Sequence, residues 1–544
     1  MDRKDIKSTP AIVQETIDRV IRKMRYSKKV RADVRAELAG HFEDALADCR
    51  TERERLDTAR RLVEEFGDTG LLARLIRRAK KRCRPLWVRV MIRTFQVAGL
   101  CVLYVILCVS RLYIGKPTIK VDLVDHINQT VQGGQPDELN AWPGVQQAIS
   151  LLAAKPDGMA GRIRYRDVNE SQRPILDRYI QDNTAAYTAL EQAVCKPCCW
   201  RYFDPVSLEA QCKGTGSVFA PRLMETVQLS AGIMDQLMPA LDQVRAVSFA
   251  LDVRRQRSVY QGRADAALAD VVTLFRLGRL QAGSGLLIEQ LVGHAILGLA
   301  VEALLETLYG LEIEQGVLAR TYEEVFSLLD GQPCWIDLTV EKALQEDLIQ
   351  RGFTDDGHGN GRMLSSGVLL VIGTPRHWWK DLLLLDFPDR QEVRTALDRF
   401  FTQMQQWNRQ TPWDCRDQSF QWNDPAYSTL VEPAYERVGQ IQWRTRAGLR
   451  AGLTVLAIKR YQAREGILPE DLDILVAEGL LNERPRDFYG PGNLTYQRRS
   501  DQEFYLYSRG EDLEDDQGMP ATNDQGRPKR YGSHGDWVFW PTQP

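Results

Sequence analysis

Apolar residues near the N-terminus of the chain recur three and four positions apart, the spacing that places side chains on one face of an α-helix. Thr9 and Pro10 form a helix start before the first such run, and Gly67 follows the third. The three runs comprise Val13, Ile17, Val20, Ile21 and Met24; Val34, Leu38, Phe42 and Leu46; and Ala59, Leu62, Val63 and Phe66. The pattern predicts a compact helical domain over residues 1–84.

Helical spacing also dominates the middle of the chain, from Pro174 onward. No fixed repeat length relates neighbouring helices, so the pattern favours an irregular α-helical array over a solenoid, and we expect such a domain over residues 173–434. The preceding residues, 115–172, are of mixed polarity with Gly and Pro interspersed. This pattern predicts a linker with short elements. Within the array, the predicted helices cover residues 221–260, 263–281, 286–309, 317–329 and 336–349.

The pattern changes in the last part of the chain, residues 435–544. A long helix is predicted through Leu449, Leu453, Leu456, Ala457 and Tyr461. Beyond it, Leu494 alternates with Tyr496, and Phe504 with Leu506, with turn residues between the two pairs. Period-two alternation predicts strands with one buried face. We therefore expect a small antiparallel sheet on this helix, an α+β element that ends a mainly α chain.

One apolar run, residues 94–110, stands apart from the amphipathic patterns. It lies between Arg93 and Arg111, and Gln96 is its only strongly polar side chain. A helix rises about 1.5 Å per residue and needs about 20 residues to cross the bilayer core, so the run is long enough once its apolar flank at residues 112–114 is included. The sequence predicts one transmembrane helix within residues 85–114.

Other apolar runs do not meet the same criteria. Residues 294–311 carry Glu302 and Glu306, and residues 367–373 are too few to span. A cleaved signal peptide is also excluded for residues 94–110, because such peptides occupy the first 15 to 30 or so positions of a chain. We therefore expect a retained signal anchor and a single-pass protein.

Charge around residues 94–110 predicts the orientation. Residues 71–93 hold nine basic side chains and no acidic one. The positive-inside rule then places the N-terminal domain in the cytoplasm and the chain after about residue 115 outside. Membrane lipid is thus one expected partner. The net charge of the whole chain is only −2, which gives it no electrostatic reason to bind nucleic acid.

The sequence of the N-terminal domain resembles the HAAS-type domain of bacterial membrane proteins, which is also known as the permease-prefix module. The segments concerned are VRADVRAELAGHFEDALADC and ARRLVEEFGDTGLLARLI. The residues that carry the resemblance are Glu37, Leu38, His41, Phe42, Asp44, Phe66, Gly67 and Asp68. The resemblance implies a cytoplasmic helical adaptor that precedes a membrane segment. With the predicted orientation, it implies a protein of the bacterial inner (cytoplasmic) membrane whose C-terminal part is periplasmic or external.

The C-terminal tail resembles the corresponding part of type II secretion pseudopilin-like proteins, and of bacterial envelope proteins of unknown function with the same ending. The matching residues are Pro469, Asp487, Gly490, Tyr507, Ser508 and Gly510. A pseudopilin carries its hydrophobic helix at the extreme N-terminus, whereas here a helical domain precedes the apolar run. Pilus assembly is therefore not expected.

Six cysteines follow the predicted span and would lie in an oxidising compartment, where disulfides form. They are Cys195, Cys198, Cys199, Cys212, Cys334 and Cys415. At least one disulfide is expected among them, while free thiols and a metal or redox role for the C-x-x-C of Cys195 and Cys198 remain open. No second pair of ligands is evident for a zinc site.

Acidic residues crowd one turn near the C-terminus, RGEDLEDDQG at residues 509–518. The five carboxylates are Glu511, Asp512, Glu514, Asp515 and Asp516, with Asn523, Asp524 and Asp536 shortly after. Crowding of this kind suits a hard cation, and the resemblance to pseudopilin-like domains implies calcium. The spacing differs from that of an EF-hand, and a solvated acidic turn is the alternative.

Searches for catalytic motifs give no result. The sequence contains no H-E-x-x-H, no P-loop and no G-x-S-x-G. We therefore expect a binding, scaffold or signal-relay protein with protein partners of unknown identity. The alternative is a membrane-anchored hydrolase whose carboxylates converge in the external helical domain. A cleft lined by several acids, or by His with acids, would favour the hydrolase, and an apolar groove would favour binding.

Overall fold

A computed structural model describes residues 9–24, 26, 28–82, 86–156, 165–204, 221–283, 285–329, 335–364, 388–422, 424, 426, 432–523, 525–527 and 529–542. The fold is mainly helical, with 17 helices and one three-stranded antiparallel sheet in the described part of the chain. This confirms the predicted mainly α class with a small antiparallel sheet. The chain forms two compact units, Met1–Leu107 and Cys108–Pro544.

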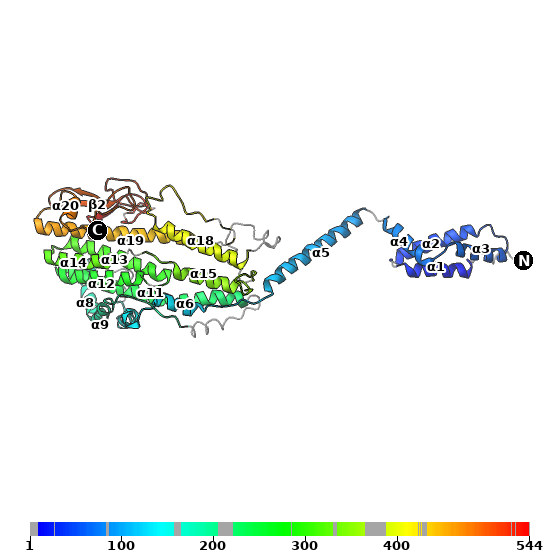
Figure 1. Ribbon diagram of the computed structural model, residues 1–544, viewed down its shortest axis with the longest axis horizontal. Helices are drawn as coiled ribbons and strands as arrows, with labels where there is room; N and C mark the ends of the chain where they lie inside the picture. The colour runs from blue at the N-terminus through cyan, green and yellow to red at the C-terminus, as the bar shows by residue number, and fades with distance from the viewer. Residues whose placement is uncertain are drawn as a thin grey trace. The chain divides into compact units, whose positions relative to one another are not determined.

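The first unit begins with a four-helix module that has its own core (Figure 1). Its helices are α1 (Ala11–Lys23), α2 (Lys28–Ala45), α3 (Glu52–Glu65) and α4 (Thr69–Arg82). The three predicted apolar runs supply that core, which includes Val13, Val34 and Phe42. Gly67, at φ +67°, makes the turn into α4, since a left-handed conformation suits glycine. Helix α4 follows the third predicted run and adds Ala73 to the core.

Helix α5 (Leu86–Tyr113) contains the predicted transmembrane run. Its segment Val90–Leu107 is long and apolar enough to cross a membrane, and none of it is buried. Helix α13 (Leu287–Gly310) passes the same test of length and composition, but 72% of its most apolar 18-residue stretch is buried. Two helices therefore qualify as candidate spans in the described part of the chain. Residues 367–373 lie outside the described residues.

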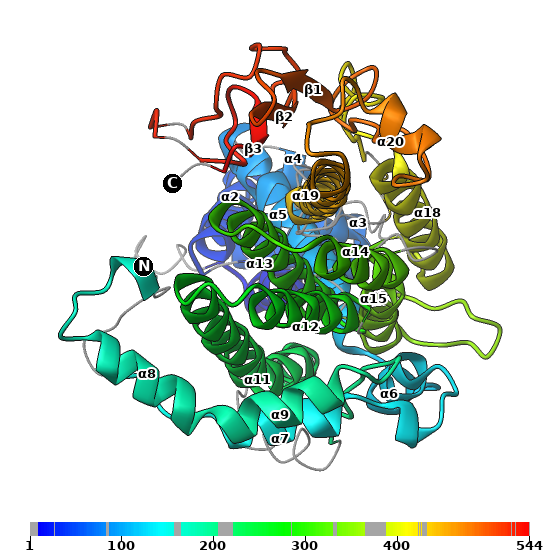
Figure 2. The same cartoon turned by 90° about the vertical axis from the view of Figure 1, so that its left-hand side faces the viewer.

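The second unit is built on long helices that run side by side (Figures 1 and 2). Helix α13 packs between α12 (Ala264–Ala282) and α19 (Glu432–Glu465), and α12 packs on α11 (Pro221–Tyr260). The five helices predicted over residues 221–349 are confirmed as α11, α12, α13, α14 (Gln315–Leu329) and α15 (Thr339–Gly352). Each agrees with its prediction within three residues at both ends. The remaining helix of this layer is α18 (Arg390–Arg409), which packs on α15 and α19.

Shorter helices lie on the outer side of α11, as Figure 2 shows for α7, α8 and α9. They are α7 (Trp142–Ser150), α8 (Arg173–Asp182) and α9 (Thr184–Ala193), whereas α6 (Leu123–Gln132) packs on α15. 3₁₀ turns lie at Asp137–Leu139 and Tyr165–Asp167. Residues 115–172, predicted as a linker with short elements, do contain short helices. Leu123, Ile127 and Val145 from this segment are nevertheless buried in the main core of the second unit.

The sheet covers α19 at the end of the chain. Strands β1 (Thr495–Arg498), β2 (Phe504–Ser508) and β3 (Trp537–Trp540) pair antiparallel in that order, after the short helix α20 (Asp473–Ala477). The predicted alternation is confirmed, because Tyr496 pairs with Leu506 in register. Phe504, Leu506 and Trp540 are buried in the same core cluster as Leu123 at the other end of the unit. One continuous core therefore includes residues from 115–172, 173–434 and 435–544.

Candidate functional site

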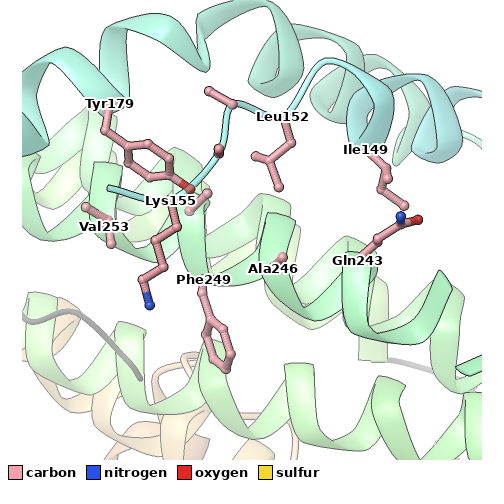
Figure 3. A pocket seen from close by; sticks show the side chains of 11 residues that line it. Ile149, Leu152, Lys155, Tyr179, Gln243, Ala246, Phe249 and Val253 are labelled. Atoms are coloured by element: carbon pink, nitrogen blue, oxygen red, sulfur yellow. The ribbon is translucent and has the colours of Figure 1, made fainter. Parts of the chain in front are cut away.

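A groove lies between α11 and the segment that joins α7 to α8 (Figure 3). Its volume is about 400 Å³. Helix α11 forms the floor, and Tyr179 of α8 closes one end. The lining residues are Ile149, Leu152, Ala153, Ala154, Lys155, Tyr179, Gln243, Ala246, Phe249, Ala250 and Val253.

Asn183 fixes the upper wall of this groove. It is fully buried between α8 and α9, and its Oδ1 accepts a 2.8 Å hydrogen bond from the backbone N–H of Ala153. Its Nδ2 donates a 2.8 Å bond to the carbonyl oxygen of Tyr179. One side chain thus ties residues 152–155 to the C-terminal end of α8. Buried amides satisfied in this way are costly to disturb, so the wall is well defined.

The chemistry of the groove is that of an apolar binding surface. Leu152, Phe249 and Val253 supply hydrocarbon, and Lys155 is the one charged side chain of the lining. Burial raises the pKa of Tyr179, which keeps its phenol neutral. The lining therefore offers mainly apolar contacts, and its polar groups are the amide of Gln243, the phenol of Tyr179 and the ammonium of Lys155. The lining holds no pair of acid and base groups suited to hydrolysis.

A second pocket, of about 210 Å³, lies between α6, α15 and α18. His126 and the carboxylates Glu346 and Asp347 line it together with Lys120, Arg390 and Arg394. Asp347 is already engaged, since its Oδ1 accepts from Gln350 Nε2 at 2.6 Å and its Oδ2 from Arg351 Nε at 2.7 Å. Glu346 lies 3.9 Å from Lys342 Nζ. The pocket differs from the groove in its several charged side chains, and both of its carboxylates are paired.

The predicted acidic turn at residues 509–518 lies after β2. Its carboxylates bond to nearby backbone N–H groups: Asp512 accepts from Gly535 at 2.6 Å, and Asp515 accepts from Gln517 at 3.1 Å. Gly510 and Gly518 both have positive φ, as turns of this kind require. No group of three or more His, Cys, Asp or Glu side chains comes together to hold a metal anywhere in the described residues. The turn therefore does not bring Glu511, Asp512, Glu514, Asp515 and Asp516 to one point.

Asp536, which the sequence associates with this turn, is buried beneath it. Its Oδ2 accepts a 2.7 Å bond from the N–H of Gly518. Burial raises the pKa of Asp536 to about 6, and the nearby charges of Asp515 and Asp516 act in the same direction. Asp487 holds the end of β2, accepting from Ser508 Oγ at 2.6 Å and from the N–H of Arg509 at 3.1 Å. Residues noted for the resemblance of the tail are thus structural contacts here.

Four of the six cysteines after the predicted span are free thiols: Cys195, Cys198, Cys199 and Cys415. Burial raises the pKa of Cys199 to about 12, which makes its thiol unreactive. Cys212 and Cys334 lie outside the described residues, as does Asp524. The expected disulfide stays a prediction.

A largely buried network of ion pairs surrounds α11, and the sequence did not predict it. Arg254 bonds to Asp270 of α12 and to Glu191 of α9, while Arg255 reaches Asp252 at 2.8 Å and Glu306 of α13 at 2.7 Å. The signal for it was the charged run within LDVRRQRS, in a helix that is apolar on either side. Pairing of this kind offsets the cost of burying these charges.

No family model, no curated protein and no solved structure matches this chain. The function is therefore inferred from its own side chains and their geometry.

Proposed function

We propose that this protein is a membrane-anchored binding protein, held by the single span α5, with its second unit as the external binding domain. The observation that carries the proposal is the contrast between α5 and α13. None of Val90–Leu107 is buried, whereas α13 packs in the core between α12 and α19. A long, fully exposed apolar helix is unfavourable in water and favourable in a bilayer.

The orientation follows from charge. Nine basic residues over positions 71–93 precede the span, and three follow it before Asp122, namely Arg111, Lys116 and Lys120. The four-helix module would then be cytoplasmic, in agreement with its resemblance to HAAS-type adaptors, and the second unit would be periplasmic or external. Its tail, which resembles pseudopilin-like domains, would lie on the same side.

The groove on α11 supports binding as the role of the external unit. It is apolar, it has one charged side chain, and its wall is held by buried hydrogen bonds. We expect it to take an apolar group, either part of a small molecule or a side chain of a protein partner. A membrane anchor with such a domain would hold its partner at the cell envelope or relay the partner's presence to the cytoplasmic module.

Photo-cross-linking in native membranes tests this role. p-Benzoyl-phenylalanine would replace Phe249 in the groove or, as a control, Tyr309, an exposed aromatic residue of α13 outside it. We expect an adduct from position 249 that is absent from position 309 and is lost when Ala246→Asp makes the groove polar. Equal adducts at both positions, or none at position 249, would contradict a binding groove.

A hydrolase is the second candidate, because His126, Glu346 and Asp347 line one pocket. This reading requires Glu346 to act as a base in spite of its pairing. The purified protein would be assayed with chromogenic esters and glycosides, beside the Glu346→Gln variant. Turnover that Glu346→Gln abolishes would establish the hydrolase, and equal background rates in both proteins would remove it.

A further inference from the structure

Helix α4 carries an apolar strip that the four-helix module does not cover. Leu71 and Leu75 are 58% and 52% exposed, and their separation of four residues places them on one face, a turn apart. Single exposed leucines are common on protein surfaces, but two in line on a short helix form a continuous apolar strip.

The strip belongs to a helix whose orientation in the module is fixed. On the opposite face, Ala73 is buried and Leu72 and Ile76 pack against the module core. Two hydrogen bonds hold the helix at either end: Lys23 Nζ donates to Thr69 Oγ1 at 3.1 Å, and Tyr26 Oη donates to the carbonyl oxygen of Arg77 at 3.1 Å. Leu71 and Leu75 therefore face outward because the module is folded.

Basic side chains surround the strip. On a helix, Arg78 continues the line of Leu71 and Leu75, and Arg74 lies beside it. Both arginines are exposed, and neither takes part in an ion pair within the described residues. The whole of α4 carries six basic residues and no acidic one. An apolar strip flanked by unpaired cations is typical of a helix that lies in a membrane interface.

Continuity with the span identifies the membrane that would cover this strip. Arg82, the last residue of α4, precedes Leu86, the first residue of α5, by four positions. Four residues reach at most about 14 Å, about twice the depth of one headgroup layer, so the end of α4 stays close to the surface that α5 enters. On the cytoplasmic side this surface is anionic, which matches the charge of the helix.

We propose that α4 is an interfacial helix: Leu71 and Leu75 insert among the acyl chains next to the headgroups, and Arg74 and Arg78 bind anionic lipid phosphates. This inference rests on the proposed single span. It goes further by giving the N-terminal module a fixed face toward the bilayer, so that the surfaces of α2 and α3 are left for cytoplasmic partners.

Site-specific photo-cross-linking of the full-length protein in nanodiscs tests the inference. p-Benzoyl-phenylalanine would replace Leu75 or, as the matched control, Leu56 on α3, which is 42% exposed in the same module. In discs that contain phosphatidylglycerol we expect lipid adducts from position 75 and few or none from position 56. Adducts from position 75 to a second copy of the chain instead of lipid, or equal lipid adducts at both positions, would overturn it.

Charge reversal supplies an independent arm of the same experiment. Each basic residue near an anionic surface contributes about 1 kcal/mol, or about a fivefold change in binding, so Arg74→Glu with Arg78→Glu should lower lipid cross-linking from position 75 at least about tenfold. Arg53→Glu with Arg61→Glu, on exposed positions of α3, makes the same change in net charge and should leave the yield within about twofold. Equal losses in the two double variants would contradict a specific α4 contact.

Alkaline washing and lipid cross-linking together distinguish a failure of the membrane anchor α5 from a failure of the interfacial helix α4. If α5 does not span, the protein will be removed from the discs by alkaline washing, and both the anchor and the interfacial helix are then wrong. If the protein resists washing but position 75 gives no lipid adduct, the anchor stands and the role of α4 is wrong. Retention together with lipid adducts from position 75 supports both.

Discussion

Arg362 Nη2 donates a 2.8 Å hydrogen bond to the carbonyl oxygen of Ile114, the first residue after α5. Close by, Asp355 Oδ2 lies 2.7 Å from both Lys120 Nζ and Arg390 Nη1. The pKa of Asp355 is lowered, first by its bond to Lys120 and then by the N–H of Gly357 and the charge of Arg390. The stem, residues 114–121, is therefore held to the rest of the second unit directly where α5 ends.

Loss of the Asp355 carboxylate charge should loosen this stem. Gln350 Oε1 accepts from the N–H groups of Lys120 and Val121 at 3.2 and 3.4 Å, so these two amides report on the attachment. We expect Asp355→Asn to speed up their hydrogen exchange several-fold, because Lys120 and Arg390 lose their common partner. Asp125→Asn, an exposed neighbour with the same charge change, should leave the exchange unaltered. Unchanged exchange in Asp355→Asn would show that the ion pairs do not hold the stem.

The close approach of α12 and α13 yields a second prediction. A methyl group at Gly293 would lie 2.1 Å from the backbone nitrogen of Ala282, so Gly293→Ala must push the helices apart. We expect a loss of about 2 to 3 kcal/mol in the free energy of unfolding by urea. Gly298→Ala, on the same helix with nothing within 4 Å of the added carbon, should instead gain about 0.5 to 1 kcal/mol. Similar effects at both positions would contradict the packing of α12 on α13.

Much of this architecture is predictable from local pattern. Helix α11 begins at Pro221 and ends at Tyr260, as the periodicity predicts, and the pairing of Tyr496 with Leu506 follows from alternation. Local sequence patterns do not predict the groove, because its wall depends on a hydrogen bond between Ala153 and Asn183, which are 30 residues apart. The sequence leaves a calcium site and a solvated acidic turn open at residues 509–518. Asp512 and Asp515 accept bonds from backbone N–H groups, a competition for their oxygens that composition does not reveal.

Burial of Asp536 should make stability depend on pH. Its pKa in the folded state is about 6, above the usual value near 3.9 for an unfolded chain, so the folded state binds more protons between these values. The stability it contributes is present below about pH 3.9 and is lost as pH rises through about 6. We expect the melting temperature of Asp536→Asn, relative to the parent, to be higher at pH 7.5 than at pH 5. Asp501→Asn, an exposed aspartate, should show no such difference, and a flat difference for Asp536→Asn would contradict the assignment.

Calcium provides a fourth test. Since Asp512 and Asp515 already accept backbone N–H bonds, we expect millimolar calcium to leave the melting temperature of the purified protein unchanged. Calorimetry with calcium and, as a control, magnesium would be run on the same preparation. Heat of binding and a rise in melting temperature with calcium alone would establish the turn at residues 509–518 as a calcium site after rearrangement.

We propose above all that α5 crosses the membrane once, with the module of α1 to α4 in the cytoplasm. Fusion of a reporter that is active only in the cytoplasm, placed before Met1 in one protein and after Pro544 in another, measures this most directly. We expect activity from the N-terminal fusion alone, and the reverse from a reporter that is active only outside the cytoplasm. Activity from the C-terminal fusion alone would reverse the orientation, and activity from both would mean that α5 does not span.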